Sequence, residues 1–567
     1  MVKVLKLLNY NSEMKMMQYK KSLFLLSFGM CIVAMTFAQD TTGKKRTIDI
    51  TSSFKPVLRD AVKINFNAAS PVVDTSKPKL TYTIPQQNLL LGYLPAPLKP
   101  VALQIDTVNA WKYSNYIKAG VGNVHIPYVQ AGFSFGDGKN SFFNIFAREY
   151  TSKGKQEFQK NNHTSVSAAG TVRTASNLEW NGGIGFKSED YFLYGFQPTN
   201  LPFTKDYLRQ RFQTYGAKLS LRNLKPTEYG LTYNPNVKID VFSGNNFNGK
   251  ATETNTLLNL PLAKTFDNFA FNLGFTADLT NYKPVSKSTI QNNLYYVSPT
   301  VQYKNENFFL TAGVSPAWDN KRFHLLPNIM ADIVTNDKNF TFQAGWIGYY
   351  QKGSYQRYAG INPWLAQPTT LLNTRVQELY AGIKGSLLDH ITYSAKAGAV
   401  QYRDMPLFAN DSADGKTFEI LNSPSVQALK LHGEIGWTQG EDLSWNNTFT
   451  LTNYIKVEQE MKAWGLTPLE ITSSLRWQLF KDFFLKGDLY AFGGAPYRGK
   501  LGPGVYTNFK GQSGVDVNAG VEFKITKALN LWLQMNNIFN NKYERWNQYP
   551  VYGFNILGGI VFSFDTK

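Results

Sequence analysis

The chain ends on two alternating segments, LNLWLQMN (residues 529–536) and GFNILGGIVFSF (residues 553–564). In the first segment, apolar residues occupy every second position from Leu529, and polar residues fill most of the positions between them. The second segment alternates in the same way and closes on Phe564. A period of two residues indicates β-strands. Alternation alone fits a soluble sandwich with an apolar core or a membrane barrel with an apolar face toward lipid.

Composition narrows the choice between these two classes. The chain has 567 residues, 15% of them aromatic and 17% charged, and its mean hydropathy is −0.30. The polar average excludes a bundle of membrane-spanning helices. The aromatic content suits a barrel with girdles of aromatic residues at both membrane interfaces. These numbers favour a large transmembrane β-barrel.

Residues 1–38 have the features of a secretory signal peptide. Lys20 and Lys21 precede an apolar run, and small residues end it at Ala38, where we expect cleavage. The run is short for a spanning helix, which needs about 20 apolar residues. Because further methionines precede the two lysines, the first residues of the segment also read as an overlong start. The sequence therefore predicts an exported protein whose mature chain begins near Gln39.

Cysteine content and charge restrict how an exported chain is stabilised and what it binds. Cys31 is the only cysteine and falls within the signal peptide, so we expect no disulfide in the mature protein. The formal charge is +19. After export we expect no nucleic-acid partner, and basic loops are better matched to outer-membrane lipid, lipopolysaccharide or an anionic ligand.

Connections between the alternating segments follow a second pattern. Tight polar turns alternate with longer loops, and this asymmetry is typical of outer-membrane barrels. The predicted turns lie at 136–140, 176–177, 223–228, 265–268, 305–307, 335–339, 387–390, 439–442, 480–482 and 525–530, and the longer loops at 151–162, 190–210, 243–253, 281–293, 349–373, 403–425, 456–469 and 491–513. Ten tight turns predict about 22 antiparallel strands in an all-β transmembrane barrel over residues 112–567. The expected location is the cell outer membrane.

The last two segments also resemble the final strands of TonB-dependent receptors, in both a motif and an ending. The matching motif residues are Asn537, Ile538, Phe539, Asn540, Lys542, Tyr543 and Gly553, whereas Phe554 replaces the usual arginine. The ending resembles the C-terminal signal read by the outer-membrane barrel assembly machinery, with Gly559, Phe562 and Phe564 in the key places. The aromatic-rich and asparagine-rich style resembles barrels of Bacteroidota-like bacteria. The resemblance implies an outer-membrane receptor that binds or transports a ligand.

The N-terminal part departs from that family. Its members carry a plug domain of well over 100 residues, whereas residues 39–111 offer roughly 70 and are rich in proline. We expect a missing or truncated plug, held in the lumen or in the periplasm. One stretch faintly resembles the TonB box, which pairs with TonB as an added strand. It consists of Arg46, Thr47, Ile48, Asp49, Ile50 and Thr51, and it also reads as an ordinary short extended segment.

Candidate sites are few. Alternation places Lys430, His432 and Glu434 together on the lumen side, as a ligand or proton site or as a solvated charge ladder. We predict no catalytic residue, no metal site and no cofactor, because no cluster has metal-ligand spacing and no phosphate-binding glycine loop is present. The loops at 353–368 and 493–511 combine aromatic and basic residues, which suits binding of a sugar or an anion as well as contact with lipopolysaccharide.

Two functions therefore stay open. The first is a TonB-dependent receptor-like transporter of an unidentified ligand. The second is a non-transporting barrel subunit that binds other outer-membrane proteins through its loops and N-terminal segment. The family resemblance favours the first, and the short N-terminal segment favours the second. An enzyme is a distant third possibility.

Overall fold

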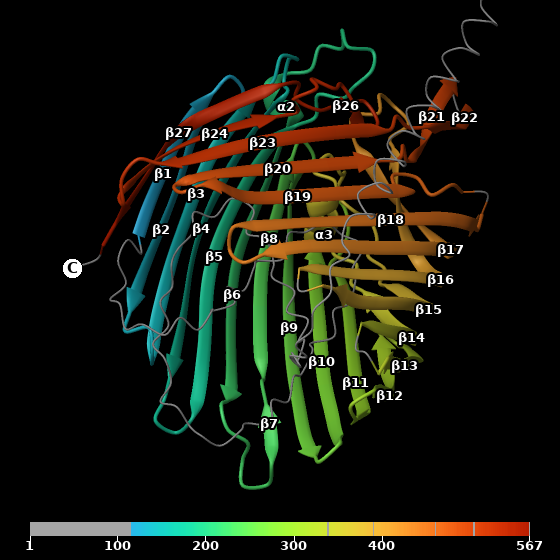
Figure 1. Ribbon diagram of the computed structural model, residues 1–567. Helices are drawn as coiled ribbons and strands as arrows, with labels where there is room; N and C mark the ends of the chain where they lie inside the picture. The colour runs from blue at the N-terminus through green and yellow to red at the C-terminus, as the bar shows by residue number, and fades with distance from the viewer. Residues whose placement is uncertain (1–114, 337–338, 389, 460, 503–504, 566–567) are drawn as a thin grey trace, which may run out of the picture. The chain divides into compact units, whose positions relative to one another are not determined.

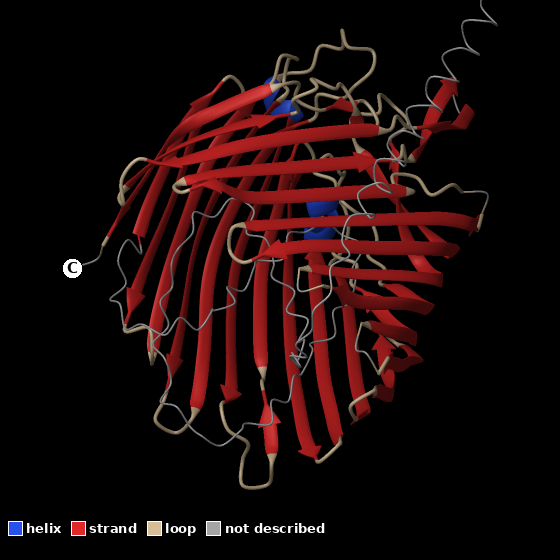
Figure 2. Ribbon diagram, in the orientation of Figure 1, coloured by secondary structure: helices blue, strands red, loops and turns tan. Residues whose placement is uncertain are grey.

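The computed structural model describes residues 115–565 apart from 337–338, 389, 460 and 503–504. Within them the chain forms one large antiparallel barrel with little helix (Figures 1 and 2). The strands are β1 (Asn115–Gly122), β2 (His125–Gly136), β3 (Ser141–Lys153), β4 (Lys160–Arg173), β5 (Leu178–Phe192), β6 (Arg209–Asn223), β7 (Leu231–Tyr233), β8 (Asn236–Asn246), β9 (Gly249–Phe266), β10 (Phe269–Lys283), β11 (Ile290–Lys304), β12 (Phe308–Asp319), β13 (Arg322–Val334), β14 (Phe340–Gln351), β15 (Thr374–Leu387), β16 (Ile391–Asn410), β17 (Phe418–Gln439), β18 (Leu443–Val457), β19 (Leu469–Phe480), β20 (Phe483–Phe492), β21 (Pro496–Gly502), β22 (Val505–Lys510), β23 (Gly514–Lys524), β24 (Leu529–Asn536), β25 (Glu544–Trp546), β26 (Tyr549–Pro550) and β27 (Asn555–Phe564). The helices are α2 (Lys205–Leu208) and α3 (Tyr355–Ile361). No helix among the described residues has the length and apolar character needed to span a bilayer.

The barrel contains 22 strands in an up-and-down order, as the turn count predicted. β7 is not an additional wall strand: it pairs with β9 just as β8 does, and Pro235 lies between the two segments. β21–β22 and β25–β26 are separate hairpins in the loops between wall strands. The predicted all-β fold is therefore confirmed.

The ten predicted tight turns all connect neighbouring wall strands at one rim. The opposite rim carries the longer connections, with three exceptions. β1 and β2 are joined by Asn123 and Val124 alone. Residues 243–253 were expected to form a loop, but β8 and β9 continue through them and leave only Phe247 and Asn248 between the strands. β12 and β13 likewise turn through Asn320 and Lys321 alone. Strands that extend beyond the membrane read as polar segments, which is why they resembled loops in the sequence.

The two faces of each strand differ as the alternation predicted. In β17, Leu429, Leu431 and Ile435 are exposed on the outside, and the residues between them face the lumen. Large exposed apolar side chains recur in this way around the barrel, with Ile184 67% and Leu379 62% exposed. An apolar exterior of this extent is stable only in contact with lipid. The outer-membrane location expected from the sequence thus agrees with the surface of the fold.

The barrel closes between its first and last strands. β1 and β27 pair antiparallel from Asn115 opposite Phe564 to Gly122 opposite Leu557, so no sheet edge faces lipid. On the lumen side of this seam, the Trp532 ring lies over the backbone near Gly120, and the Lys118 ammonium sits 4.1 Å from the centre of that ring. At the same seam, Gly559 of β27 has no space for a side chain, because an added Cβ would collide with the carbonyl oxygen of Ala119.

We expect Gly559→Val to block closure of the barrel. Overpacking a close backbone contact costs about 1–3 kcal/mol or more, and here it falls on the pairing that removes the last edge. The matched control is Gly487→Ala in β20, where the nearest atom to an added Cβ is 3.7 Å away. The heat-modifiable band of the folded barrel on gels should be lost for Gly559→Val and kept for Gly487→Ala. Equal band intensities would contradict this account of the seam.

The loop-side ends of β14 to β17 do not continue straight along the barrel wall. Six successive residues of β16 from Met405 to Asn410 are buried, although a wall strand of a barrel buries only alternate residues. Phe418 at the start of β17 is buried as well. These strand ends therefore lean over the lumen and support the loops that fill its mouth.

Candidate functional site: a loop cap in the lumen mouth

Four loops pack together at the loop-side mouth of the barrel, and we call them the loop cap: residues 193–208, 352–373, 411–417 and 537–554. The central member is the 352–373 loop, which carries α3 into the ring of strands (Figures 1 and 2). α3 begins where the Ser354 hydroxyl accepts the Arg357 N–H at 3.1 Å. It ends at Asn362, directly before Pro363, which cannot continue a helix.

A buried carboxylate holds the start of α3 against the lumen wall. Glu253 of β9 is 0% exposed and lies on the lumen face of that strand. Its carboxylate oxygens accept the backbone N–H groups of Tyr355 at 2.6 Å and Gln356 at 3.0 Å. These are among the N–H groups that a helix start leaves without internal partners, and negative charge is favoured there. Glu253 thus acts as an anchor for the cap from outside the loop itself.

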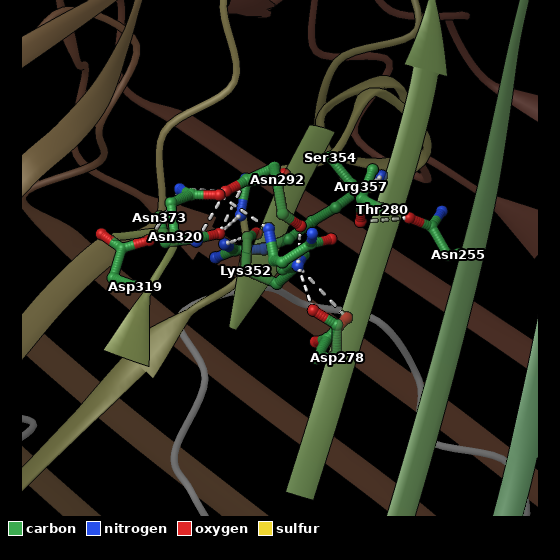
Figure 3. A network of polar contacts seen from close by, with 12 residues as sticks. Asn255, Asp278, Thr280, Asn292, Asp319, Asn320, Lys352, Ser354, Arg357 and Asn373 are labelled. Carbon is green, nitrogen blue, oxygen red and sulfur yellow. Dashed lines mark hydrogen bonds and ion pairs between the residues drawn. The ribbon is translucent and has the colours of Figure 1, made fainter. Parts of the chain in front are cut away.

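A second set of polar contacts fixes both ends of the 352–373 loop (Figure 3). Lys352 donates to the carbonyl oxygens of Asp278 at 2.6 Å and Asn292 at 2.5 Å, and its ammonium lies 3.4 Å from the Asp278 carboxylate. At the other end, Asn373 and Asn292 exchange amide hydrogen bonds of 2.7 and 2.8 Å. Asn373 also donates to Asp319 at 2.6 Å. The loop is therefore clamped where it leaves β14 and where it enters β15.

Burial changes the ionisation of groups in the cap. Burial lowers the pKa of the Lys352 ammonium, and the neighbouring Asp278 carboxylate opposes this shift. Burial also raises the pKa of the Tyr358 hydroxyl to about 12. The contacts of Lys352 consist mostly of carbonyl oxygens, which favour its protonated form. The clamp thus depends on a buried charge that has to keep its partners.

Aromatic packing joins the loops to one another. Trp364 stacks on Tyr549 with ring centres 4.0 Å apart, and Tyr194 meets Tyr549 edge-on at 4.9 Å. Tyr355 packs in the same cluster against Phe212 and other lumen-facing rings of the wall. Hydrogen bonds from Tyr194 to Pro550 at 2.9 Å and from Trp364 to Phe192 at 3.2 Å reinforce these contacts. The cap loops and the lumen-facing rings of the wall thus form one hydrophobic cluster inside the barrel mouth.

We expect Trp364→Ala to loosen this core without unfolding the barrel. Trp364 is partly buried, so its truncation should cost less than the roughly 3–5 kcal/mol of a fully buried aromatic side chain, and the loss falls on contacts between loops. The control is Trp477→Ala, which removes a 40% exposed ring from the outer face of β19. Limited proteolysis should cut within the cap loops of Trp364→Ala and spare both the control and the wild type. Unchanged resistance of Trp364→Ala would show that the stack does not hold the cap.

The predicted lumenal residues lie where alternation placed them. His432 Nε2 is 2.8 Å from the Glu434 carboxylate, and His432 Nδ1 is 2.8 Å from the Thr450 hydroxyl. Lys430 is on the same face of β17, two residues away. These contacts agree with a satisfied polar ladder on the wall, and the three residues stay a candidate site only as a prediction. No group of three or more His, Cys, Asp or Glu placed for a metal occurs in the described part of the chain.

The two other predicted sites lie at opposite ends of the chain. Gly559, Phe562 and Phe564 belong to β27 at the closing seam, and the rings of Phe562 and Phe564 stack with centres 5.8 Å apart. Their reading as an assembly signal stays a prediction. The TonB-box-like segment, residues 46–51, lies outside the described residues, as does the Pro-rich segment up to residue 111.

The loops expected to form an exposed binding surface behave differently from each other. Residues 353–368 do not form that surface, because Tyr355 and Tyr358 are buried in the cap. Residues 493–511 form a projecting hairpin, in which Arg498 lies over the rings of Trp464 and Tyr506. The sequence signalled an aromatic loop at 353–368. The sequence did not indicate which residues bury that loop, because Glu253 and Asn292 lie on strands far from it in the sequence.

The sequence matches no protein-family profile and no curated protein sequence at a significant level. The structure, however, is similar to solved outer-membrane receptors. The siderophore receptor PirA from Acinetobacter baumannii shares 11% identity, with a TM-score of 0.61 over 79% of this chain and 80% of that chain. The FrpB iron transporter from Neisseria meningitidis gives the same identity and TM-score over 79% and 81%. The ferripyoverdine receptor of the outer membrane of Pseudomonas aeruginosa gives 0.58 at 11% identity over 81% and 73%.

This chain has the receptor-barrel fold. The resemblance to TonB-dependent receptors that the C-terminal motif indicated is confirmed at the level of the fold. The comparison covers most of this chain.

Proposed function

We propose that this chain is an outer-membrane receptor of the TonB-dependent type, in which the loop cap controls access from the cell exterior to the lumen. One observation carries the proposal. The central loop of the cap sits inside a receptor-type barrel and is held there only by non-covalent contacts to lumen-facing residues such as Glu253, Asp278 and Asn292. A loop held in this way can leave the mouth while every strand pairing of the barrel stays intact.

The proposal is one of binding and uptake rather than catalysis. The solved neighbours include a siderophore receptor and an iron transporter, and a chelated nutrient of that general kind is the ligand class that this fold suggests by analogy. A barrel of this width needs an obstruction, since 22-stranded outer-membrane transporters have a plugged lumen. The loop cap supplies a closure at the loop-side mouth.

We further propose that residues 46–51 couple the receptor to TonB and that residues 39–111 form a shortened plug-like segment. Deletion of residues 46–53 with the barrel intact tests the coupling. If this chain is a receptor, association with TonB in affinity purification should be lost while the amount of heat-modifiable barrel stays normal. If the full chain shows no TonB association and instead co-purifies with other outer-membrane proteins, the chain is a non-transporting subunit and the receptor proposal is wrong.

A further inference from the structure

A pocket of about 240 Å³ lies beside the base of the 352–373 loop and is lined mainly by polar and charged side chains. Its cationic residues are Arg322 of β13, Arg375 of β15 and Arg403 of β16, and His324 and Tyr350 complete the same wall. We call it the arginine pocket. At about 30 Å³ for each water molecule of the liquid, it has room for about eight waters or for a small multivalent anion.

The pocket forms because the upper ends of β14–β16 lean into the lumen. Arg375 of β15 lies opposite Tyr350 of β14 and opposite Arg403 of β16. By alternation these three side chains belong to the same face of the sheet as Leu379 of β15, which is exposed on the outside of the barrel. Tyr350 nevertheless packs with Leu326, a lumen-facing residue of β13. The outer face of the leaning strands therefore meets the inner face of β12 and β13, and the pocket lies between them.

The charge pattern of the pocket is unbalanced. Arg375 and Arg403 are like charges placed directly across an antiparallel pair, an arrangement that is destabilising without a counter-charge. Asp319 and Asp404 also line the pocket, but three guanidinium groups still outnumber them. Within the described residues, none of the three pocket arginines forms an ion pair with a carboxylate, whereas Arg211 in β6 is paired with Asp190 at 2.6 Å.

The pocket is also joined to the clamp of the cap. Asp319 accepts amide hydrogen bonds from Asn373 at 2.6 Å and from Asn320 at 3.1 Å, so much of its acceptor capacity is used for the loop. Arg375 follows Asn373 by two residues, and Tyr350 precedes Lys352 by two. Asp404 has a φ of 56°, a left-handed conformation that is uncommon for non-glycine residues, although Asp adopts it more often than most. Strained residues of this sort are concentrated at binding and switching sites.

We infer that the arginine pocket binds a small multivalent oxyanion, of the phosphate or carboxylate class, beside the clamped ends of the 352–373 loop. Guanidinium groups bind such anions through paired, charge-assisted hydrogen bonds. Three of them converging from three strands suit two or more anionic groups on one ligand. The inference deepens the proposed function by naming the ligand chemistry, and it rests on that function only for the link to the cap. The anion could come from a soluble ligand or from the phosphates of lipopolysaccharide.

Direct binding to the full-length protein in detergent tests the site. Pyrophosphate and citrate serve as soluble probes, measured by calorimetry for the wild type and for Arg375→Gln/Arg403→Gln. Losing two charge-assisted donors should weaken binding at least about tenfold. The matched control is Arg476→Gln, which removes a lumen-facing arginine of β19 outside the pocket and should leave binding unchanged. A heat-modifiable band must be present for each variant. If the double variant Arg375→Gln/Arg403→Gln does not fold, the single variant Arg322→Gln is measured in its place.

The outcomes separate the site from the proposed function and the two sources of anion from each other. Saturable binding that depends on the pocket arginines supports a soluble ligand. If the soluble probes bind only after lipopolysaccharide is stripped from the wild type, and if lipopolysaccharide is retained by the wild type but not by the double variant, the source is lipid phosphate. No binding of any of these anions, or equal binding by the double variant, overturns the site. Because none of these readouts measures TonB association or transport, a failed receptor proposal leaves them unaffected.

Discussion

Replacing residues 355–371 by a short glycine-serine linker is expected to turn a closed barrel into an open pore. The deletion removes α3 and Trp364, which contribute much of the aromatic cluster that fills the mouth. It leaves Lys352 and Asn373 and every wall strand in place. A 22-stranded barrel without an obstruction encloses a wide aqueous lumen. In planar bilayers, the full-length variant should show large and persistent conductance steps that the wild type lacks.

The control for this deletion is removal of the β21–β22 hairpin, which projects from the barrel as a separate two-stranded sheet. That variant should conduct no more than the wild type. A second comparison locates the obstruction. If the 355–371 deletion stays closed and conducts only when residues 39–111 are removed as well, the N-terminal segment closes the lumen and the cap does not.

Glu253→Ala is expected to unseat the cap with a single substitution. The change leaves the N–H groups of Tyr355 and Gln356 without their buried acceptor. It also removes one of two side-chain acceptors of the Asn255 amide, at 2.7 Å, while the Gln356 side chain remains at 2.9 Å. Leaving buried donors unsatisfied costs about 1–3 kcal/mol for each group. Two such groups give about 2–6 kcal/mol, and every 1.4 kcal/mol corresponds to a tenfold change in the open population, so we expect opening to increase by about 30-fold or more.

Hydrogen exchange of the amides in residues 355–361 measures this opening directly, because exchange reports local unfolding. The rates should rise in Glu253→Ala while those of the β1–β27 pairing stay as they are in the wild type. Glu419→Ala provides the control, since that side chain is 49% exposed and its one ion pair, with Arg498, is long at 3.6 Å. Exposed ion pairs of this kind contribute about 0–1 kcal/mol. Equal exchange in the wild type and in Glu253→Ala would contradict the anchoring role of Glu253.

The barrel could be predicted from the sequence because its determinants are local. Alternation at Leu429 and Leu431 fixes the face of one strand without reference to any other, and turn residues such as Asp137, which accepts three backbone N–H groups, mark where the strands reverse. Loop-side boundaries were less predictable. Strands beyond the membrane keep their pairing but lose the apolar face, as in β8 and β9, so they could not be told from loops.

The cap could not be predicted, because it depends on contacts between residues far apart in the sequence. Tyr355 reads as an exposed loop aromatic until Glu253 and the lumen-facing Phe212 are placed beside it. The arginine pocket was even less predictable from the sequence. Arg322 and Arg375 belong to different strands and to opposite faces by parity, and they meet only because the ends of β14–β16 lean inward. The residues around His432, by contrast, lie on the face that simple alternation gives them, and their role as a site stays a prediction.

Cysteine labelling offers the most direct test of the central claim that the cap is seated and closed. The mature chain is expected to contain no cysteine, so a single introduced thiol can be followed without background. Ala359 is buried in the cap, whereas its neighbour Gly360 is exposed and has no atom within 4 Å of an added Cβ. In the purified protein, Ala359→Cys should react with a maleimide at least about 100-fold more slowly than Gly360→Cys, and Glu253→Ala should remove most of that protection. Equal labelling rates at the two positions in the otherwise unchanged protein would contradict the account.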